Sequence, residues 1–223
     1  MKKVCFVNGS PRESGSTSAY FIGEIQKLIK SCDIETQDVY TIKDLKLGKV
    51  VEGFEKIINA DRVVFVFPLY VDSISSNFLD YLWRLENYIK ENKIDKDKLP
   101  NLYAVINCGF VEGIQNKNAV KIIHNFSKKA GFDFKFAIGI GGGEFVKGTK
   151  DRIPIDSEVK KDIYLALCKL KDSIESSRED DEKIVFVSPK VSKSQFILKA
   201  NNSWVKKAKE NNMTEEDLLK KVY

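Results

Sequence analysis

Residues 4–18, the most informative stretch of the chain, read Val4-Cys5-Phe6-Val7-Asn8-Gly9-Ser10-Pro11-Arg12-Glu13-Ser14-Gly15-Ser16-Thr17-Ser18. Four apolar residues predict a short buried strand, and an amphipathic stretch from residue 19 predicts a helix. A loop that leaves a strand and opens a helix presents unpaired backbone N–H groups at the positive end of the helix dipole. The loop therefore predicts an anion site, formed by the side chains of Ser10, Arg12, Ser16, Thr17 and Ser18.

Helix capping is the alternative explanation for this loop, because Ser, Thr and Gly are ordinary residues before a helix. Four hydroxyls and an arginine exceed what a cap requires, which favours an anion, and a phosphate in particular. The spacing matches neither G-x-x-x-x-G-K-[ST] nor G-x-G-x-x-G. Without the P-loop lysine, and without an acidic residue ending the second strand, ATP and NAD are disfavoured as the tightly held nucleotide.

Apolar runs alternate with amphipathic stretches along the chain. Strands are predicted at 3–8, 34–39, 62–68, 102–107 and 134–140, and helices at 16–31, 76–91, 118–130 and 157–176. Nearly continuous Val, Ile and Phe is typical of parallel strands covered on both faces. We expect an α/β three-layer sandwich with a five-stranded parallel sheet in the flavodoxin-like order 2-1-3-4-5. That order brings three loops together at the carboxyl edge of the sheet: 10–18, 69–76 and 108–113.

The predicted core ends at a charged run, which divides the chain into a domain at 1–177 and an appendage at 178–223. The appendage contains a short apolar run at 184–187 and a lysine-rich helical pattern that includes Phe196 and Trp204. It is too short and too charged for an independent domain. We expect it to pack on the core or on a second subunit.

The third predicted strand ends at Pro68, and the second loop follows with Leu69, Tyr70 and Val71. Pro68 lacks an N–H and marks the end of strand pairing. Leu69 and Tyr70 then offer an apolar and aromatic platform for a flat ring. An equally good reading is that they simply cover the end of the sheet.

The fourth predicted strand ends at Asn107, and the third loop follows with Cys108, Gly109 and Phe110. Its glycine permits a close backbone approach, and its amides can reach the edge of a ring. Cys108 resembles a nucleophile, but no base adjoins it in the sequence, so a packing residue near the ligand is the better interpretation. The glycine-rich run 139–144 precedes no immediate helix and is predicted to form a mobile lid or rim.

Composition excludes several other classes of protein. The chain has 223 residues, of which 43% are hydrophobic and 31% charged, as in a globular protein. No signal peptide or membrane span is recognisable, so we expect a cytoplasmic protein. The four cysteines form no C-x-x-C pair and His124 is the only histidine, so neither a metal site nor a disulfide framework is expected. The net charge is +5, and the basic side chains are interleaved with acidic ones instead of gathering in one stripe, which disfavours nucleic acid as a partner.

Taken together, these motifs resemble the NADPH-dependent FMN reductase and NAD(P)H:quinone oxidoreductase-like branch of the flavodoxin-like superfamily. The resemblance covers about residues 1–175. It implies that the first loop holds the FMN phosphate and that residues 68–71 and 107–110 cradle the isoalloxazine. It also implies a homodimer. Two departures stand out: Ser75-Ser76 replaces a glycine common in relatives, and the C-x-x-C-x-x-C insert of the iron–sulfur branch is absent.

The leading hypothesis is therefore an FMN-dependent oxidoreductase that takes hydride from NAD(P)H and reduces a small-molecule acceptor such as a quinone, a flavin or a nitro compound. No catalytic side chain is implied, because the flavin carries the chemistry. One alternative is a flavodoxin-type electron carrier, although such carriers tend to be acidic and this chain is basic. Another alternative is a flavin-free binding or regulatory protein of the same fold.

Overall fold

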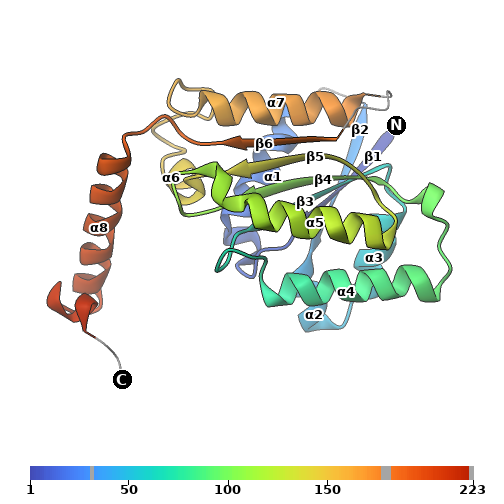
Figure 1. The fold of residues 1–223 in the computed structure, drawn as a ribbon, viewed down its shortest axis with the longest axis horizontal. Coiled ribbons are helices and arrows are strands. Elements are labelled where there is room, and N and C mark those ends of the chain that lie inside the picture. The colour runs from blue at the N-terminus through green and yellow to red at the C-terminus, as the bar shows by residue number, and fades with distance from the viewer. Residues whose placement is uncertain (31–32, 177–181, 221–223) are drawn as a thin grey trace. The chain divides into compact units, whose positions relative to one another are not determined.

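The computed structural model describes residues 1–30, 33–176 and 182–220, which fall into two compact units, Met1–Pro189 and Lys190–Tyr223. Within the described residues, the first unit contains a parallel sheet of six strands in the order β2-β1-β3-β4-β5-β6 (Figure 1). The strands are β1 (Lys2–Asn8), β2 (Ile34–Tyr40), β3 (Arg62–Pro68), β4 (Asn101–Asn107), β5 (Asp133–Ile140) and β6 (Lys183–Val187).

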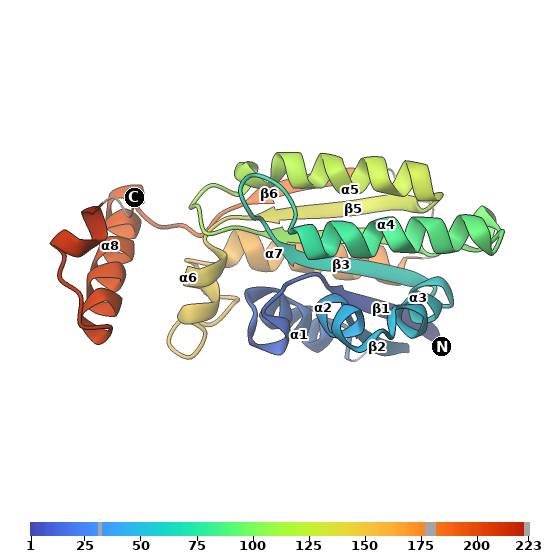
Figure 2. The same cartoon turned by 90° about the horizontal axis from the view of Figure 1, so that it is seen from below.

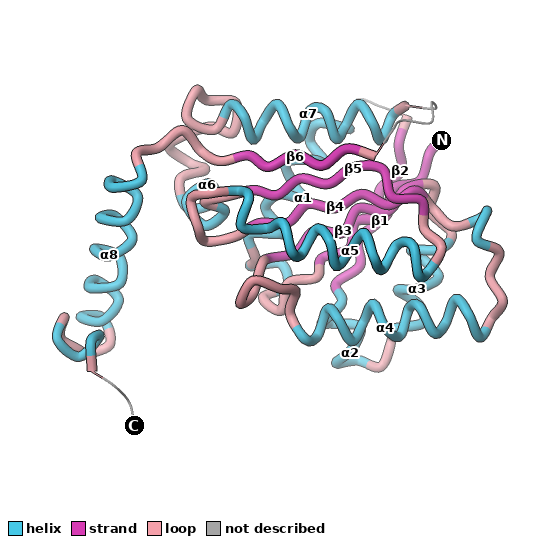
Figure 3. The backbone as a smooth tube through the Cα atoms, in the orientation of Figure 1, coloured by secondary structure: helices cyan, strands magenta, loops and turns pink. Residues whose placement is uncertain are grey.

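The sixth strand corrects the prediction of five. β6 pairs with β5 in parallel, with Val185 opposite Ile138, and lies at the edge of the sheet (Figure 3). The sequence signal was weak because an edge strand is covered less than a central one, and the β6 side chains are at most half-buried. This strand lies within the first compact unit, which runs through Pro189. Residues 178–181, at the predicted domain boundary, lie outside the described residues.

Helices cover both faces of the sheet (Figure 2). Alternate strand residues divide between two cores, because successive side chains of a strand point to opposite faces. Cys5 and Val7 of β1 pack with α3, α4 and α5, whereas Val4 and Phe6 pack with α1 and α7. The helices of this unit are α1 (Thr17–Ile29), α2 (Thr41–Leu47), α3 (Val50–Ile58), α4 (Ser76–Glu91), α5 (Lys117–Ala130), α6 (Gly143–Gly148) and α7 (Lys161–Glu175).

One ionic cluster joins two of these helices. Glu86 of α4 is 5% exposed, and its carboxylate accepts hydrogen bonds from Lys90 of the same helix and from Lys129 of α5, the latter at 3.3 Å. Burial raises the pKa of the Glu86 carboxyl, but the two lysine hydrogen bonds outweigh it and leave the pKa below its ordinary value. The cluster therefore favours the packed arrangement of α4 and α5 at neutral pH.

The second unit consists of α8 (Lys193–Glu210) and a short 3-10 turn, Glu216–Leu219. Its helix matches the lysine-rich helical pattern of the sequence. Several of its large apolar side chains are exposed within this unit, among them Leu198 and Trp204. Across the described parts of the chain, no helix combines the length and the apolar character that a membrane crossing requires.

Candidate functional site

Three loops meet at the carboxyl edge of the sheet, as the predicted strand order requires. β1, β3 and β4 end side by side, with Asn8 opposite Val66 and Pro68 opposite Asn107. Backbone hydrogen bonds continue past the strand ends: the Gly9 N–H donates to the Val66 carbonyl at 3.0 Å, and the Leu69 N–H to the Asn107 carbonyl at 2.8 Å. The loop after β1 is thus held next to the loops after β3 and β4.

The loop after β1 is shaped by Asn8 and Ser16. The Ser16 hydroxyl caps α1 by accepting the Ala19 N–H at 3.0 Å, and it donates to the Glu13 carbonyl at 2.6 Å. The Asn8 amide donates to that carbonyl and to the Ser16 hydroxyl, and its oxygen accepts the Ser10 N–H at 2.9 Å. The Ser16 hydroxyl both donates and accepts hydrogen bonds inside the loop, so this side chain has a structural role there.

Donors for an anion remain at the start of α1. The backbone N–H groups of Thr17 and Ser18 occupy the first turn, and neither donates to any other group of the described chain. The Ser18 hydroxyl accepts a hydrogen bond from the Asn107 amide at 3.2 Å, which ties this turn to the end of β4. The Arg12 side chain is two-thirds exposed above the turn. This donor set fits a phosphate, which accepts several hydrogen bonds at once.

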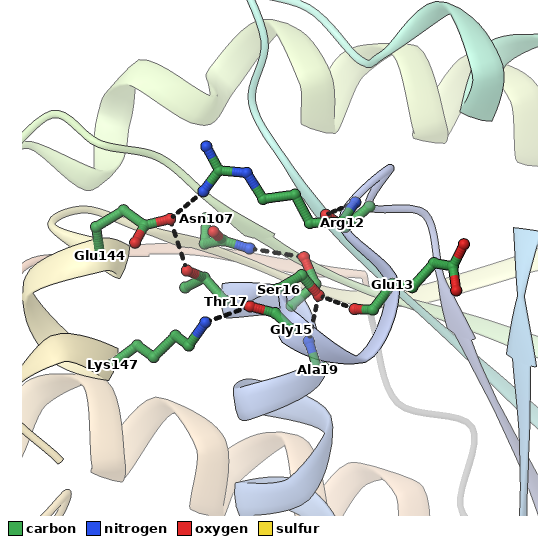
Figure 4. A network of polar contacts seen from close by, with 11 residues as sticks. Arg12, Glu13, Gly15, Ser16, Thr17, Ala19, Asn107, Glu144 and Lys147 are labelled. Carbon is green, nitrogen blue, oxygen red and sulfur yellow. Dashed lines mark hydrogen bonds and ion pairs between the residues drawn. The ribbon is translucent and has the colours of Figure 1, made fainter. Parts of the chain in front are cut away.

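An acidic side chain contacts Arg12 and the Thr17 hydroxyl at the start of α1 (Figure 4). Glu144, near the start of α6, accepts the Thr17 hydroxyl at 2.9 Å and lies 3.4 Å from the Arg12 guanidinium. Lys147, on the same helix, donates to the Gly15 carbonyl. The carboxylate and the ammonium thus hold α6 against the loop after β1.

The glycines after β5 allow this approach. A Cβ on Gly141 would lie 1.9 Å from the Val111 carbonyl oxygen, so only glycine fits there. Gly142 has φ +62, in the left-handed region, and a Cβ on Gly143 would come within 3.2 Å of Asn107 and Thr17. The expectation that no helix directly follows this run is wrong, because α6 begins at Gly143. It is missed in the sequence because six residues with two glycines carry no helical period.

The loop after β3 contains a tight turn at Tyr70–Ser73. Tyr70 and Ser73 exchange two backbone hydrogen bonds of 2.9 Å each, and the two residues between them have positive φ, +45 at Val71 and +56 at Asp72. Val71 is 99% exposed and Tyr70 is 36% exposed. The turn therefore presents an apolar side chain and an aromatic ring to the outside of the sheet edge.

Of the four site residues predicted at the end of β4 and in the loop after it, two are exposed and two are buried. Gly109 and Phe110 are exposed, with the Phe110 side chain at 55%. Asn107 and Cys108 are buried, and the Asn116 amide donates to the Cys108 sulfur at 3.4 Å. Burial raises the pKa of the Cys108 thiol, which is the opposite of what an activated nucleophile needs. Cys108 is thus a packed thiol beside the loop.

Sequence reasoning did not single out three residues that organise this region: Asn8, Asn116 and Glu144. Asn8 adjoins the hydroxyl-rich loop, and a buried amide after a strand is a signal that could have marked it. Asn116 is fully buried and joins the loop after β4 to β5 through the Ile140 carbonyl at 3.2 Å. Glu144 carries no such signal, because its partners lie about 130 positions earlier in the chain.

No protein-family model matches the chain, and no curated protein sequence is significantly similar to it. Solved structures are similar in fold. RosB with bound 8-demethyl-8-formylriboflavin-5'-phosphate superposes with a TM-score of 0.59 at 17% identity, over 91% of this chain and 87% of RosB. The FMN-dependent NADH-azoreductase from Bacillus anthracis, in complex with FMN, gives a TM-score of 0.53 at 15% identity, over 79% of this chain and 100% of the azoreductase.

A third similar structure is the NAD(P)H:quinone oxidoreductase from Methanothermobacter marburgensis, with a TM-score of 0.57 at 11% identity, over 80% of this chain and 98% of the reductase. The structural neighbours thus include NAD(P)H-dependent FMN oxidoreductases. At these identities the similarity shows the fold, and the chain has the flavodoxin-like fold predicted from its sequence.

Proposed function

We propose that this protein is an FMN-dependent oxidoreductase that takes hydride from NAD(P)H and passes the electrons to a small-molecule acceptor such as a quinone, a flavin or a nitro compound. One observation carries the proposal: a donor-rich helix start and two loops with exposed aromatic side chains meet at one edge of the sheet. Parallel α/β sheets bind their ligands at this edge, outside the carboxyl ends of the strands. A ligand with a phosphate joined to a flat ring matches this arrangement, with the phosphate at the start of α1 and the ring along the two loops.

The phosphate end would be held by the first turn of α1. The N–H groups of Thr17 and Ser18 have no partner in the described chain, and they lie where the helix dipole favours negative charge. Arg12 supplies the positive charge, and the hydroxyls of Ser10, Thr17 and Ser18 supply further donors. Ser16 would support the turn through its cap, since its hydroxyl is already used there.

The ring end would lie along the loops after β3 and β4. Tyr70 and Phe110 are the exposed aromatic residues of these loops, and Leu69 is partly buried between strand and loop. Together with Val71 they offer apolar area on one side of a ring, while the other side stays open for the nicotinamide and then the acceptor. Pro68, Asn107, Cys108 and Gly109 would set the backbone positions around the ring.

FMN supplies the hydride and electron transfer when it is bound, so the residues of the chain need only bind and orient it. Tyr70 and Phe110 would exclude water from one ring face. The backbone amides of the loop after β4 would hydrogen-bond the ring edge, a task for which the exposed Gly109 leaves space. Cys108 would take no chemical part, because its thiol is buried and its pKa is raised.

The absorbance spectrum of the purified protein, incubated with FMN and desalted, tests the proposal. We expect an oxidised-flavin spectrum that NAD(P)H bleaches without oxygen and that a quinone restores. Arg12→Gln should raise the Kd for FMN roughly tenfold through loss of a charged donor, whereas the control Arg152→Gln, at another exposed arginine, should not. A colourless protein that takes up no FMN contradicts the proposal.

We also propose a homodimer, in keeping with the resemblance. The support is apolar area that the first unit leaves uncovered on α4, where Leu79 is 53% and Trp83 is 58% exposed, one helical turn apart. Light scattering of the purified protein should give twice the chain mass of 25.4 kDa. Replacing Trp83 by a charged residue should shift that mass toward the monomer.

A further inference from the structure

We propose that Glu144 is an internal competitor for the anion site at the start of α1, so that a ligand phosphate binds only by displacing the Glu144 carboxylate. This inference rests on the proposed function, since it concerns the phosphate end of the same site. Its basis is that the carboxylate contacts Thr17 and Arg12, two of the residues assigned to the phosphate. Figure 4 shows the carboxylate between these two donors.

Backbone hydrogen bonds hold the start of α6, and with it the backbone of Glu144, next to the anion site. Gly142 in the left-handed region donates its N–H to the Phe110 carbonyl, and the Gly143 N–H donates to the Cys108 carbonyl at 2.8 Å. These bonds fix the start of α6 against the loop after β4. The fully buried Lys160 donates to the Val146 carbonyl at 2.9 Å, which holds the middle of α6. The helix is therefore anchored whether or not the carboxylate keeps its partners.

The contact itself is easily exchanged. The Glu144 and Arg12 side chains are 63% and 68% exposed, and exposed ion pairs contribute only about 0.2–1 kcal/mol. A phosphate could replace the carboxylate on Thr17 and Arg12 by a side-chain rotation, and it would also gain the free N–H groups of Thr17 and Ser18. The displaced carboxylate would stay close because α6 is anchored, and its negative charge would oppose the phosphate.

The competition acts on phosphorylated ligands only. A flavin without a phosphate places no charge at the start of α1, so its binding should not depend on Glu144. The Glu144 charge would thus lower the affinity for FMN relative to riboflavin, and would keep the site closed to weakly held anions. The residue that competes with the phosphate thus lies outside the predicted site.

Titration of FMN and of riboflavin against three forms of the protein, by quenching of flavin fluorescence, tests this role. The forms are wild type, Glu144→Gln and the control Glu52→Gln. Glu52 lies on α3, is about as exposed as Glu144, and has its carboxylate 3.5 Å from the Lys49 ammonium. Glu144→Gln should bind FMN about two- to fivefold more tightly than wild type, the change that corresponds to an exposed ion pair. Riboflavin should bind all three forms equally, and Glu52→Gln should match wild type throughout.

Equal or weaker FMN binding by Glu144→Gln than by Glu52→Gln overturns the competitor role and leaves the proposed function standing. If no form binds either flavin, the proposed function fails, and inorganic phosphate at constant ionic strength decides the inference by itself. A larger phosphate-induced rise in Tm for Glu144→Gln than for wild type supports the competitor role in that case. An equal rise, or none in either form, overturns it.

Discussion

Replacing Val71 by asparagine is expected to stabilise the protein by about 1 kcal/mol, because valine sits in a backbone conformation that suits it poorly. Its φ is +45, in the left-handed region, where a β-branched residue is a clear outlier. Asp72 also has positive φ, so the turn has the type I′ conformation, in which asparagine is preferred. The valine side chain is 99% exposed, so no buried contact is lost with it.

The magnitude follows from the difference between two costs. The left-handed conformation costs an ordinary L-residue about 1–2 kcal/mol, and asparagine is several-fold enriched there. A net gain of about 1 kcal/mol raises the Tm of a chain of this size by about 2–4 °C. Val71→Gly should gain less, because glycine adds about 0.4–1 kcal/mol of chain entropy to the unfolded state.

Urea unfolding of the purified proteins is the assay, with Val51→Asn as the matched control. Val51 is 46% exposed but lies in α3, where valine and asparagine have similar propensities, so its change should stay within about 0.5 kcal/mol. A Val71→Asn protein no more stable than wild type or the control refutes the strain argument. FMN titration of the same variant shows whether the gain comes at the cost of ring binding, as expected if Val71 contacts the ring.

Three further outcomes are expected. Gly141→Ala should destabilise the protein by about 2 kcal/mol or more in urea unfolding, because the added Cβ would overlap the Val111 carbonyl. The control Gly23→Ala adds a Cβ that meets nothing near α1 and should stabilise the protein by about 0.5–1 kcal/mol. Equal effects of the two substitutions would contradict the packing around α6. Glu86→Gln should cost about 1 kcal/mol at pH 7, and this cost should shrink as the pH falls through the lowered native pKa of the Glu86 carboxyl. The Glu86 carboxyl has a lower pKa in the native than in the unfolded protein. Its stabilising effect is therefore present above the unfolded pKa of about 4.3 and is lost as the pH falls through the native pKa. Acid unfolding that is the same in wild type and Glu86→Gln would argue against the lysine contacts. Cys108 should react with iodoacetamide much more slowly in the native than in the unfolded protein, as read by mass spectrometry, since burial raises its pKa; rapid native labelling would show an accessible thiol.

Much of the fold follows from patterns within short windows of sequence. β3 and α4 begin and end at the predicted residues, because a continuous apolar run and a helical apolar stripe each leave one solution. α2 and α3 between β2 and β3 were not predicted, since each is short and the two together span only residues 41–58. β6 was identified as an apolar run but not as a strand of the sheet. Its pairing depends on the crossover through α7, which no local pattern describes.

The donor-rich start of α1 and the ends of the central strands can be read from the sequence, because helix capping, apolar periodicity and strand ends are properties of neighbouring residues. The contacts within the site depend on the folded structure. In the folded chain the Ser16 hydroxyl caps α1, the Cys108 thiol is buried, and the Glu144 carboxylate contacts Thr17 and Arg12. These contacts join residues far apart in the chain, and their strength depends on distance and solvent exposure, which exist only once the chain has folded.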